Sequence, residues 1–197
     1  MSVKPQKIKP LIAGNWKMNG GAKGMVQLKS LIRHLGKKQG GAEVMICPPA
    51  IDISQAVQLA KGSKLGIGGQ DCHEMASGAF TGDISAQMFK AYGAKAVIVG
   101  HSERRQGHLE TNKNVKAKAQ AVCNAGLTSI LCIGETLKER KAGQTLSVIG
   151  AQLRGSIPQE VKPQKLIIAY EPVWAIGTGH TPTADQVAQV HAHIRKR

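Results

Sequence analysis

Five polar residues of types that carry out acid–base chemistry follow short apolar runs in this sequence. Asn15 and Lys17 follow the first such run, His101 and Glu103 a later one, and Glu171 the last. A carboxylate can take a proton, an imidazole can give one, and a lysine ammonium stabilises a developing oxyanion. Taken singly, such a histidine or glutamate is more often structural. Five such residues at the ends of predicted strands favour a shared active site.

The elements that must position these residues alternate regularly along the chain. Short β-branched runs are separated by segments with apolar spacings of three and four, which is typical of a parallel α/β fold. The last helix is expected to begin at Thr183, because Gln186 gives a capping-box spacing. Six βα units in a single domain, residues 1–197, would bring the strand ends to one edge. The expected strands are Leu11 to Gly14, Glu43 to Cys47, Lys64 to Gly68, Ala96 to Val99, Thr128 to Ile133 and Leu166 to Tyr170.

The composition indicates a basic protein without the features of a nucleic-acid binder. The chain has 197 residues, of which 42% are hydrophobic, enough for a substantial core. Its 27 Lys and Arg against 12 Asp and Glu give a formal charge of +15. The aromatic content of 3% is too low for base-stacking platforms. We therefore expect no nucleic-acid partner, and scattered lysines such as Lys37 and Lys38 are expected on solvated helix faces.

The cysteines and the apolar runs restrict where the protein works. Cys47, Cys72, Cys123 and Cys132 are widely spaced with no Cys-x-x-Cys pair, which argues against a zinc site or a disulfide framework. The apolar runs are too short to span a bilayer, and no charged segment followed by an apolar stretch opens the chain. We expect free thiols, no membrane partner and a cytoplasmic location.

Longer motifs surround the strand-end residues and carry a specific resemblance. In their order and spacing they make the chain similar to the triosephosphate isomerase family, whose fold is the TIM (β/α)8 barrel. The resemblance covers essentially the whole sequence. The motifs are residues 15–19 (NWKMN), 78–82 (GAFTG), 100–105 (GHSERR), 132–136 (CIGET) and 170–179 (YEPVWAIGTG).

The resemblance implies a reaction and a role for each strand-end residue. The family interconverts dihydroxyacetone phosphate and D-glyceraldehyde 3-phosphate through an enediolate, in glycolysis and gluconeogenesis, and needs no cofactor or metal. Glu171 would be the base, and His101 would act neutral as the donor to the substrate oxygens. Lys17 would supply positive charge, with Asn15 as a fixed dipole beside it. Glu103 would either handle protons or orient Lys17.

The resemblance also implies a lid, a phosphate contact and a dimer. Pro172 to Gly179 would form a lid that closes over the site. The Gly177 amide would bind the substrate phosphate together with Lys17. Thr81 resembles the residue that reaches into a second subunit, which implies a homodimer.

The sequence departs from the family after its sixth helix. A barrel of this type has eight strands and roughly 250 residues, so two βα units are not represented. Phosphate sites of such barrels commonly use the loops after strands seven and eight. We therefore expect a C-terminally incomplete barrel with open edges at its first and sixth strands, and essentially no activity from these 197 residues alone. The alternative is a catalytically inactive remnant that acts only as a dimerising or structural fragment.

Overall fold

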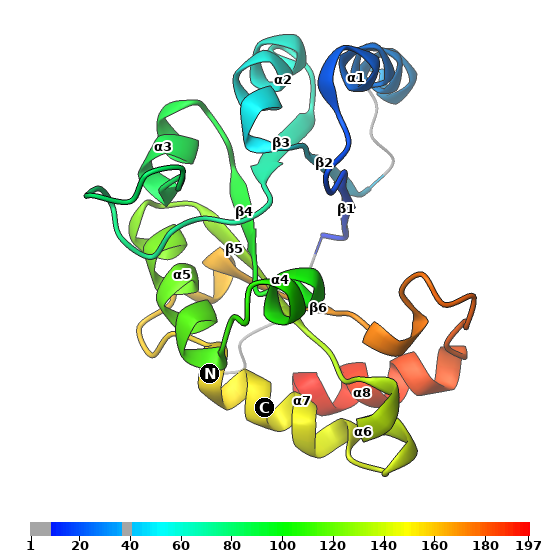
Figure 1. Ribbon diagram of the computed structural model, residues 1–197. Helices are drawn as coiled ribbons and strands as arrows, with labels where there is room; N and C mark the ends of the chain where they lie inside the picture. The colour runs from blue at the N-terminus through cyan, green and yellow to red at the C-terminus, as the bar shows by residue number, and fades with distance from the viewer. Residues whose placement is uncertain (1–8, 37–40) are drawn as a thin grey trace, which may run out of the picture.

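The computed structural model of the chain describes residues 9–36 and 41–197, and its centre is one parallel sheet (Figure 1). Its six strands lie in chain order, and each pairs in parallel with the next, so all their carboxyl ends meet at one edge. Lys37 and Lys38 lie outside the described residues. The strands are β1 (Leu11–Asn15), β2 (Glu43–Cys47), β3 (Leu65–Gly69), β4 (Ala96–Val99), β5 (Thr128–Ile133) and β6 (Leu166–Tyr170).

Helices connect the strands and cover the outer face of the curled sheet (Figure 1). None of the described helices is long and apolar enough to cross a membrane. The α-helices are α1 (Gly21–Leu35), α2 (Ile53–Ala60), α3 (Ala86–Ala91), α4 (Ser102–Gly107), α5 (Asn112–Asn124), α6 (Leu137–Lys141), α7 (Thr145–Ser156) and α8 (Ala184–Arg195), and the 3-10 turns are η1 (Ala50–Asp52), η2 (Pro163–Lys165) and η3 (Val173–Ala175).

The predicted parallel α/β architecture is confirmed, with small corrections at two strands. The first strand continues to Asn15, because Asn15 pairs in register with Cys47. The third strand runs from Leu65 to Gly69, one residue later than predicted, because Gly69 pairs with Val97. The predicted start of the last helix is correct: the Thr183 hydroxyl accepts from the Gln186 N–H, and the Gln186 side chain accepts from the Thr183 N–H.

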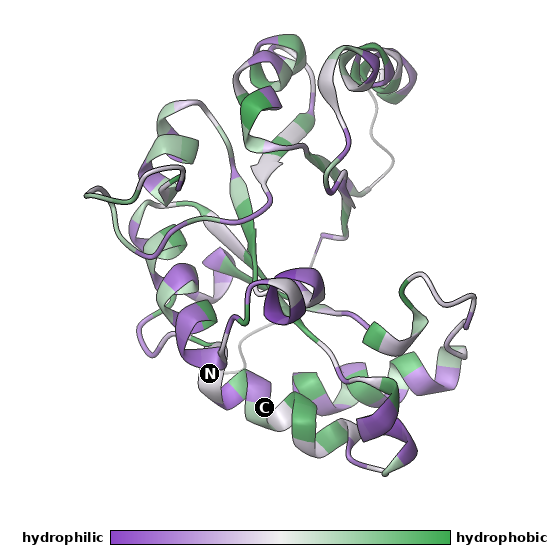
Figure 2. Cartoon of the chain, in the orientation of Figure 1, coloured by the Kyte–Doolittle hydropathy of each residue, from purple (hydrophilic) through white to green (hydrophobic). Residues whose placement is uncertain are grey.

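Side chains alternate between the two faces of each strand and form two apolar layers. Residues such as Val97, Val99 and Leu131 pack against the helices in the larger cluster. Their sequence neighbours point to the opposite, concave face of the sheet, where Ile98 and Ile130 belong to a smaller cluster. Apolar residues therefore dominate most of the strands (Figure 2), as expected for strands of a parallel sheet.

Two strand edges are open among the described residues. β1 and β6 lie at the two ends of the sheet, as the sequence predicted. Ile12 in β1 is 61% exposed, and every residue of β6 is only half-buried. The curled sheet is therefore a partial barrel of six βα units.

The cysteines are free thiols that pack as small apolar side chains. Cys47, Cys72 and Cys132 are buried, and Cys123 is half-buried. Burial raises the pKa of the Cys47 and Cys72 thiols to about 12. These two cysteines are therefore protonated at neutral pH and poor nucleophiles.

Candidate active site

His101 follows β4 and caps the first turn of α4. Its Nδ1 accepts a hydrogen bond from the Glu103 N–H at 3.3 Å. Because a neutral imidazole has one donor and one acceptor nitrogen, an accepting Nδ1 leaves the ring proton on Nε2. Nε2 lies 3.2 Å from Oε1 of Glu171. The ring therefore presents an N–H donor at the same place as the carboxylate.

Glu171 is the first residue after β6, and the ends of β4 and β5 hold it. Its Oε2 accepts a hydrogen bond from the Ser102 N–H at 3.1 Å, and its own N–H donates to the Ile133 carbonyl at 2.8 Å. A Cβ on Gly134 would overlap the Glu171 carbonyl oxygen, so the two backbones approach too closely for a side chain there. Burial and the nearby Glu171 charge raise the pKa of the Cys132 thiol. The Glu171 carboxylate is thus held by fixed contacts and is mostly shielded from solvent.

Lys17 lies in a strained turn after β1. Its φ of +52° is in the left-handed region, which residues other than glycine seldom adopt. The Asn15 side chain accepts from the Lys17 N–H at 2.9 Å, and the Gln70 amide donates to the Lys17 carbonyl and the Cys47 carbonyl, each at 2.8 Å. These contacts hold the turn on both sides and fix where the lysine side chain begins.

Glu103 joins Lys17 to the histidine. Its Oε1 lies 2.6 Å from Nζ of Lys17, and its Oε2 lies 3.5 Å from Nδ1 of His101. Since Nδ1 already accepts from the Glu103 N–H, the carboxylate finds its donor in Lys17 instead. Of the two roles that the sequence left open, the geometry favours orienting Lys17.

The segment 172–179 between β6 and α8 is anchored in its first half and exposed in its second. Trp174, in η3, is 9% exposed, and its indole N–H donates to Oε1 of Glu135 at 3.0 Å. The Thr178 hydroxyl donates to the Trp174 carbonyl. Gly177 and Gly179 are exposed, with φ of +69° and +78°. The segment that was predicted to form a lid is therefore held at Trp174 and exposed at its two glycines.

Glu135 is a site residue to which the sequence analysis gave no role. Its side chain is fully buried and accepts hydrogen bonds from Trp174, Tyr170 and Arg140 at about 3.0 Å. Burial and the Glu135 charge raise the pKa of the Tyr170 phenol. Glu135 follows β5 closely, as Glu171 follows β6, so the strand-end rule could have found it. The Ser102 N–H could not be predicted as a donor to Glu171, because a backbone donor does not depend on residue type.

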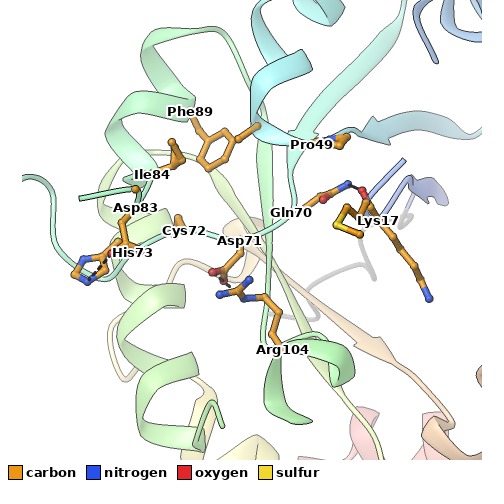
Figure 3. Close-up of a pocket in the computed structure, with 13 residues that line it drawn as sticks. Lys17, Pro49, Gln70, Asp71, Cys72, His73, Asp83, Ile84, Phe89 and Arg104 are labelled. Carbon is orange, nitrogen blue, oxygen red and sulfur yellow. Dashed lines mark hydrogen bonds and ion pairs between the residues drawn. The ribbon is translucent and has the colours of Figure 1, made fainter. Parts of the chain in front are cut away.

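A pocket of about 280 Å³ opens beside the Lys17 turn (Figure 3). Lys17, Met18 and Gln70 line it, together with Asp71 and Arg104, which lie 2.9 Å apart. It is not lined by His101 or Glu171, so it adjoins the catalytic groups without enclosing them. Within the described residues, no three His, Cys, Asp or Glu side chains are grouped to hold a metal ion.

The structure brings most of the predicted site residues together. Contacts run from Asn15 through Lys17 and Glu103 to His101 and Glu171. Thr81 and Gly177 are both exposed. No hydrogen bond or ion pair joins either of them to this chain of contacts in the part of the protein that the structure describes.

The fold and the site place the protein in the class of parallel α/β-barrel enzymes, whose active sites lie at the carboxyl ends of the strands. The family model described as triosephosphate isomerase matches residues 10–197. With these motifs and this fold, the chain belongs to the triosephosphate isomerase family.

Similar proteins with this name come from several bacteria. The triosephosphate isomerase of Afipia carboxidovorans is 53% identical over 192 residues, which covers 98% of this chain and 76% of that protein. That of Brucella abortus biovar 1 is 50% identical over 96% of this chain and 75% of its own length. The crystal structure of triosephosphate isomerase from Bartonella henselae superposes with a TM-score of 0.88 at 44% identity, covering 96% of this chain and 75% of that one. The matched part of each relative is thus about three quarters of its length.

Proposed function

We propose that this protein interconverts dihydroxyacetone phosphate and D-glyceraldehyde 3-phosphate through an enediolate, as a step of glycolysis and gluconeogenesis. Relatives named triosephosphate isomerase, at about 50% identity over nearly all of the chain, support this substrate. The observation that carries the proposal is the 3.2 Å separation of His101 Nε2 and Glu171 Oε1. A base and an N–H donor so placed can act on neighbouring atoms of one small substrate.

The proposed reaction is two proton transfers within one molecule. The Glu171 carboxylate takes a proton from the carbon beside the carbonyl, and the carbonyl electrons move onto oxygen as the enediolate forms. The Nε2–H of His101 donates to that oxygen and passes protons between the two substrate oxygens. Glu171 then returns a proton to the other carbon. The electrons stay within the substrate, so the step needs no redox cofactor, and the His101 N–H polarises the carbonyl oxygen.

The remaining site residues bind and orient in this proposal. The Lys17 ammonium offsets the charge of the phosphate dianion and of the developing oxyanion, and the Gly177 N–H contributes to the phosphate site. Asn15 fixes the Lys17 backbone at 2.9 Å, and Glu103 fixes its side chain at 2.6 Å. Closing residues 172–179 over the substrate would exclude water from the base.

We infer further that two copies of the protein associate through the loop between β3 and α3. Phe80 is 41% exposed and Met75 50% exposed on this loop, and such apolar side chains are better covered. Met18, beside Lys17, is 97% exposed and lines the 280 Å³ pocket. A partner's loop that carries Thr81 would fit beside this pocket and would support the Lys17 turn.

We also infer that residues 1–197 act as one domain and that the protein works in the cytoplasm. The continuous sheet from β1 to β6 supports the first inference. A substrate that is a small, soluble sugar phosphate supports the second.

A coupled assay with dihydroxyacetone phosphate tests the function. The assay uses the full-length protein, meaning the whole natural polypeptide that contains residues 1–197. Glu171→Gln removes the base but keeps the shape, so turnover should fall roughly 1000-fold or more, while Glu160→Gln, on an exposed residue, should change nothing. No turnover by the unchanged protein, or near-normal turnover by Glu171→Gln, contradicts the proposal.

The dimer has its own test. Thr81→Arg should shift the sedimentation coefficient toward that of a monomer and lower activity in the same samples. The matched control is Gln159→Arg on an exposed loop. If Thr81→Arg sediments as the unchanged protein does, the loop is not the interface.

A further inference from the structure

Arg105 is a half-buried residue of α4 that the chain of catalytic contacts does not include. Its guanidinium donates to four acceptors, all of them neutral. Nε donates to the Gly100 carbonyl at 2.8 Å, and Nη1 donates to the Asn112 side-chain oxygen at 2.8 Å. Nη2 donates to the Cys132 carbonyl at 3.2 Å and lies 3.4 Å from the Ser156 hydroxyl.

The two carbonyl groups belong to the strand ends that carry the active site. Gly100 directly precedes His101, and Cys132 lies at the end of β5 with its thiol beside Glu171. The guanidinium therefore links the end of β4 to the end of β5. A planar fork with five N–H donors can make these contacts at once, whereas a lysine ammonium is a single compact donor group.

The charge of Arg105 has no partner at contact distance. Among the described residues, none of the ion pairs involves Arg105, although Arg104 next to it contacts both Asp71 and Glu110. Burial lowers the pKa of the Arg105 guanidinium, and the negative charges of Glu110 and Glu171 oppose that effect. A half-buried cation without a paired carboxylate is costly, so its place between the ends of β4 and β5 calls for a role.

We propose that Arg105 is a positioning residue for the isomerase reaction, and that its positive charge, held behind the ends of β4 and β5, stabilises the ionised Glu171. This inference rests on the proposed function. The groups that face Glu171 are the His101 imidazole and the Ser102 N–H from the end of β4, and the Cys132 thiol from β5. Lys17, the other cation of the site, pairs with Glu103 at 2.6 Å. Among the described residues, Arg105 is thus a nearby cation that no carboxylate contacts.

If the Arg105 charge stabilises ionised Glu171, removing it should change the pH dependence of kcat/KM. Removing a cation near a carboxylate favours its protonated form. In Arg105→Gln the acid limb of the kcat/KM profile should therefore move to higher pH by about 0.5 unit or more. kcat should fall roughly 10-fold to 100-fold with a smaller change in KM, since the strand ends lose their link. Arg105→Lys should restore the acid limb but only part of kcat.

A second variant changes the charge without removing Arg105. Asn112 Oδ1 accepts from Nη1 at 2.8 Å, so Asn112→Asp places a carboxylate there with almost the same shape. It should move the acid limb in the same direction as Arg105→Gln while the protein stays folded. The matched control is Arg33→Gln, which removes the same charge from the exposed face of α1.

The outcomes separate this inference from the function on which it rests. All variants are measured in the coupled assay beside the unchanged full-length protein, and circular dichroism checks the fold. The inference is supported by two results together. The unchanged protein turns over substrate, and the acid limb moves in Arg105→Gln and Asn112→Asp but stays near its normal place in Arg105→Lys. An acid limb that stays in place in both variants overturns it, even if kcat falls, because Arg105 would then be only structural. Absence of turnover in the unchanged protein overturns the proposed function and this inference with it.

Discussion

Nδ1 of His101 accepts the hydrogen bond of the Glu103 N–H at 3.3 Å, and this single contact decides which ring nitrogen carries the proton. Because Nδ1 is the acceptor, Nε2 is the donor, and Nε2 is the nitrogen that lies 3.2 Å from Glu171. The same peptide unit leaves the Glu103 carboxylate free to pair with Lys17. One turn of α4 thus sets both the tautomer of the histidine and the orientation of the lysine.

The position of the Glu171 carboxylate should matter as well as its presence. Glu171→Asp keeps the charge but withdraws the oxygens by one methylene from the proton they must take. We expect kcat to fall roughly 100-fold or more, because misplacement of a catalytic group by about 1 Å has such effects. The free energy of unfolding should hardly change. Steady-state kinetics and urea denaturation check both, and Glu160→Asp is the control. A turnover close to normal would contradict the role of Glu171 as base.

Replacing the lysine of the strained turn should damage binding and rate together. Lys17→Met keeps most of the stem but removes the ammonium that faces the phosphate and the oxyanion. We expect kcat/KM to fall roughly 100-fold or more through changes in both constants. Lys29→Met, on an exposed part of α1, is the matched control. If Lys17→Met changed only thermal stability, Lys17 would be a structural residue.

The indole of Trp174 should hold the lid to the end of β5. Trp174→Phe keeps an aromatic ring but removes the N–H that donates to the buried Glu135 carboxylate at 3.0 Å. Loss of this hydrogen bond should lower the free energy of local unfolding of the segment by about 2 kcal/mol. Hydrogen exchange of residues 172–179 should become faster, and kcat/KM should fall. Tyr92→Phe, at an exposed position, is the control. Unchanged exchange in this segment would show that the bond does not anchor the lid.

Asp71, Glu110, Arg104 and Lys118 form an ion cluster beside the pocket, with ion pairs of 2.6 to 2.9 Å. Neutralising one of its two carboxylates should affect stability differently from neutralising the other. Burial by itself would raise the pKa of Glu110, but hydrogen bonds from Lys118 and Arg104 hold it below its ordinary value of 4.5. Burial raises the pKa of Asp71 despite the same two cations. Glu110→Gln should therefore lower the free energy of unfolding at pH 7 by about 3 kcal/mol. Asp71→Asn should leave it nearly unchanged or raise it.

The lowered pKa of Glu110 determines how the effect of Glu110→Gln changes with pH. A carboxylate whose pKa is lowered on folding stabilises the protein above its unfolded value, and the stabilisation is lost as the pH falls through the folded value. The difference in unfolding free energy between the unchanged protein and Glu110→Gln should therefore be full above pH 4.5 and shrink below it. Urea denaturation from pH 3 to pH 7 measures it. A difference that stays constant with pH would mean that shape rather than charge makes Glu110 important.

Much of the fold was contained in local sequence patterns. Apolar runs such as Ala96 to Val99 and Thr128 to Ile133 gave strands with the observed bounds, and the spacing of Thr183 and Gln186 gave the start of α8. These signals are local because strand alternation and helix capping depend on residues a few positions apart. The strand-end rule also selected Lys17, His101 and Glu171, since parallel strands end at one edge whatever their order.

The tertiary structure decided what depends on contacts between distant segments. Glu135 accepts hydrogen bonds from Tyr170 and Trp174 only because β6 and η3 bring these two residues to it. Arg105 gained its place behind the catalytic groups because the carbonyls of Gly100 and Cys132 converge on it from two strands. The sequence was enough to predict which chemical groups take part, since residue type determines acidity and charge. Only the packed sheet fixed which groups touch, because hydrogen bonds form over about 3 Å and such distances are set by the whole fold.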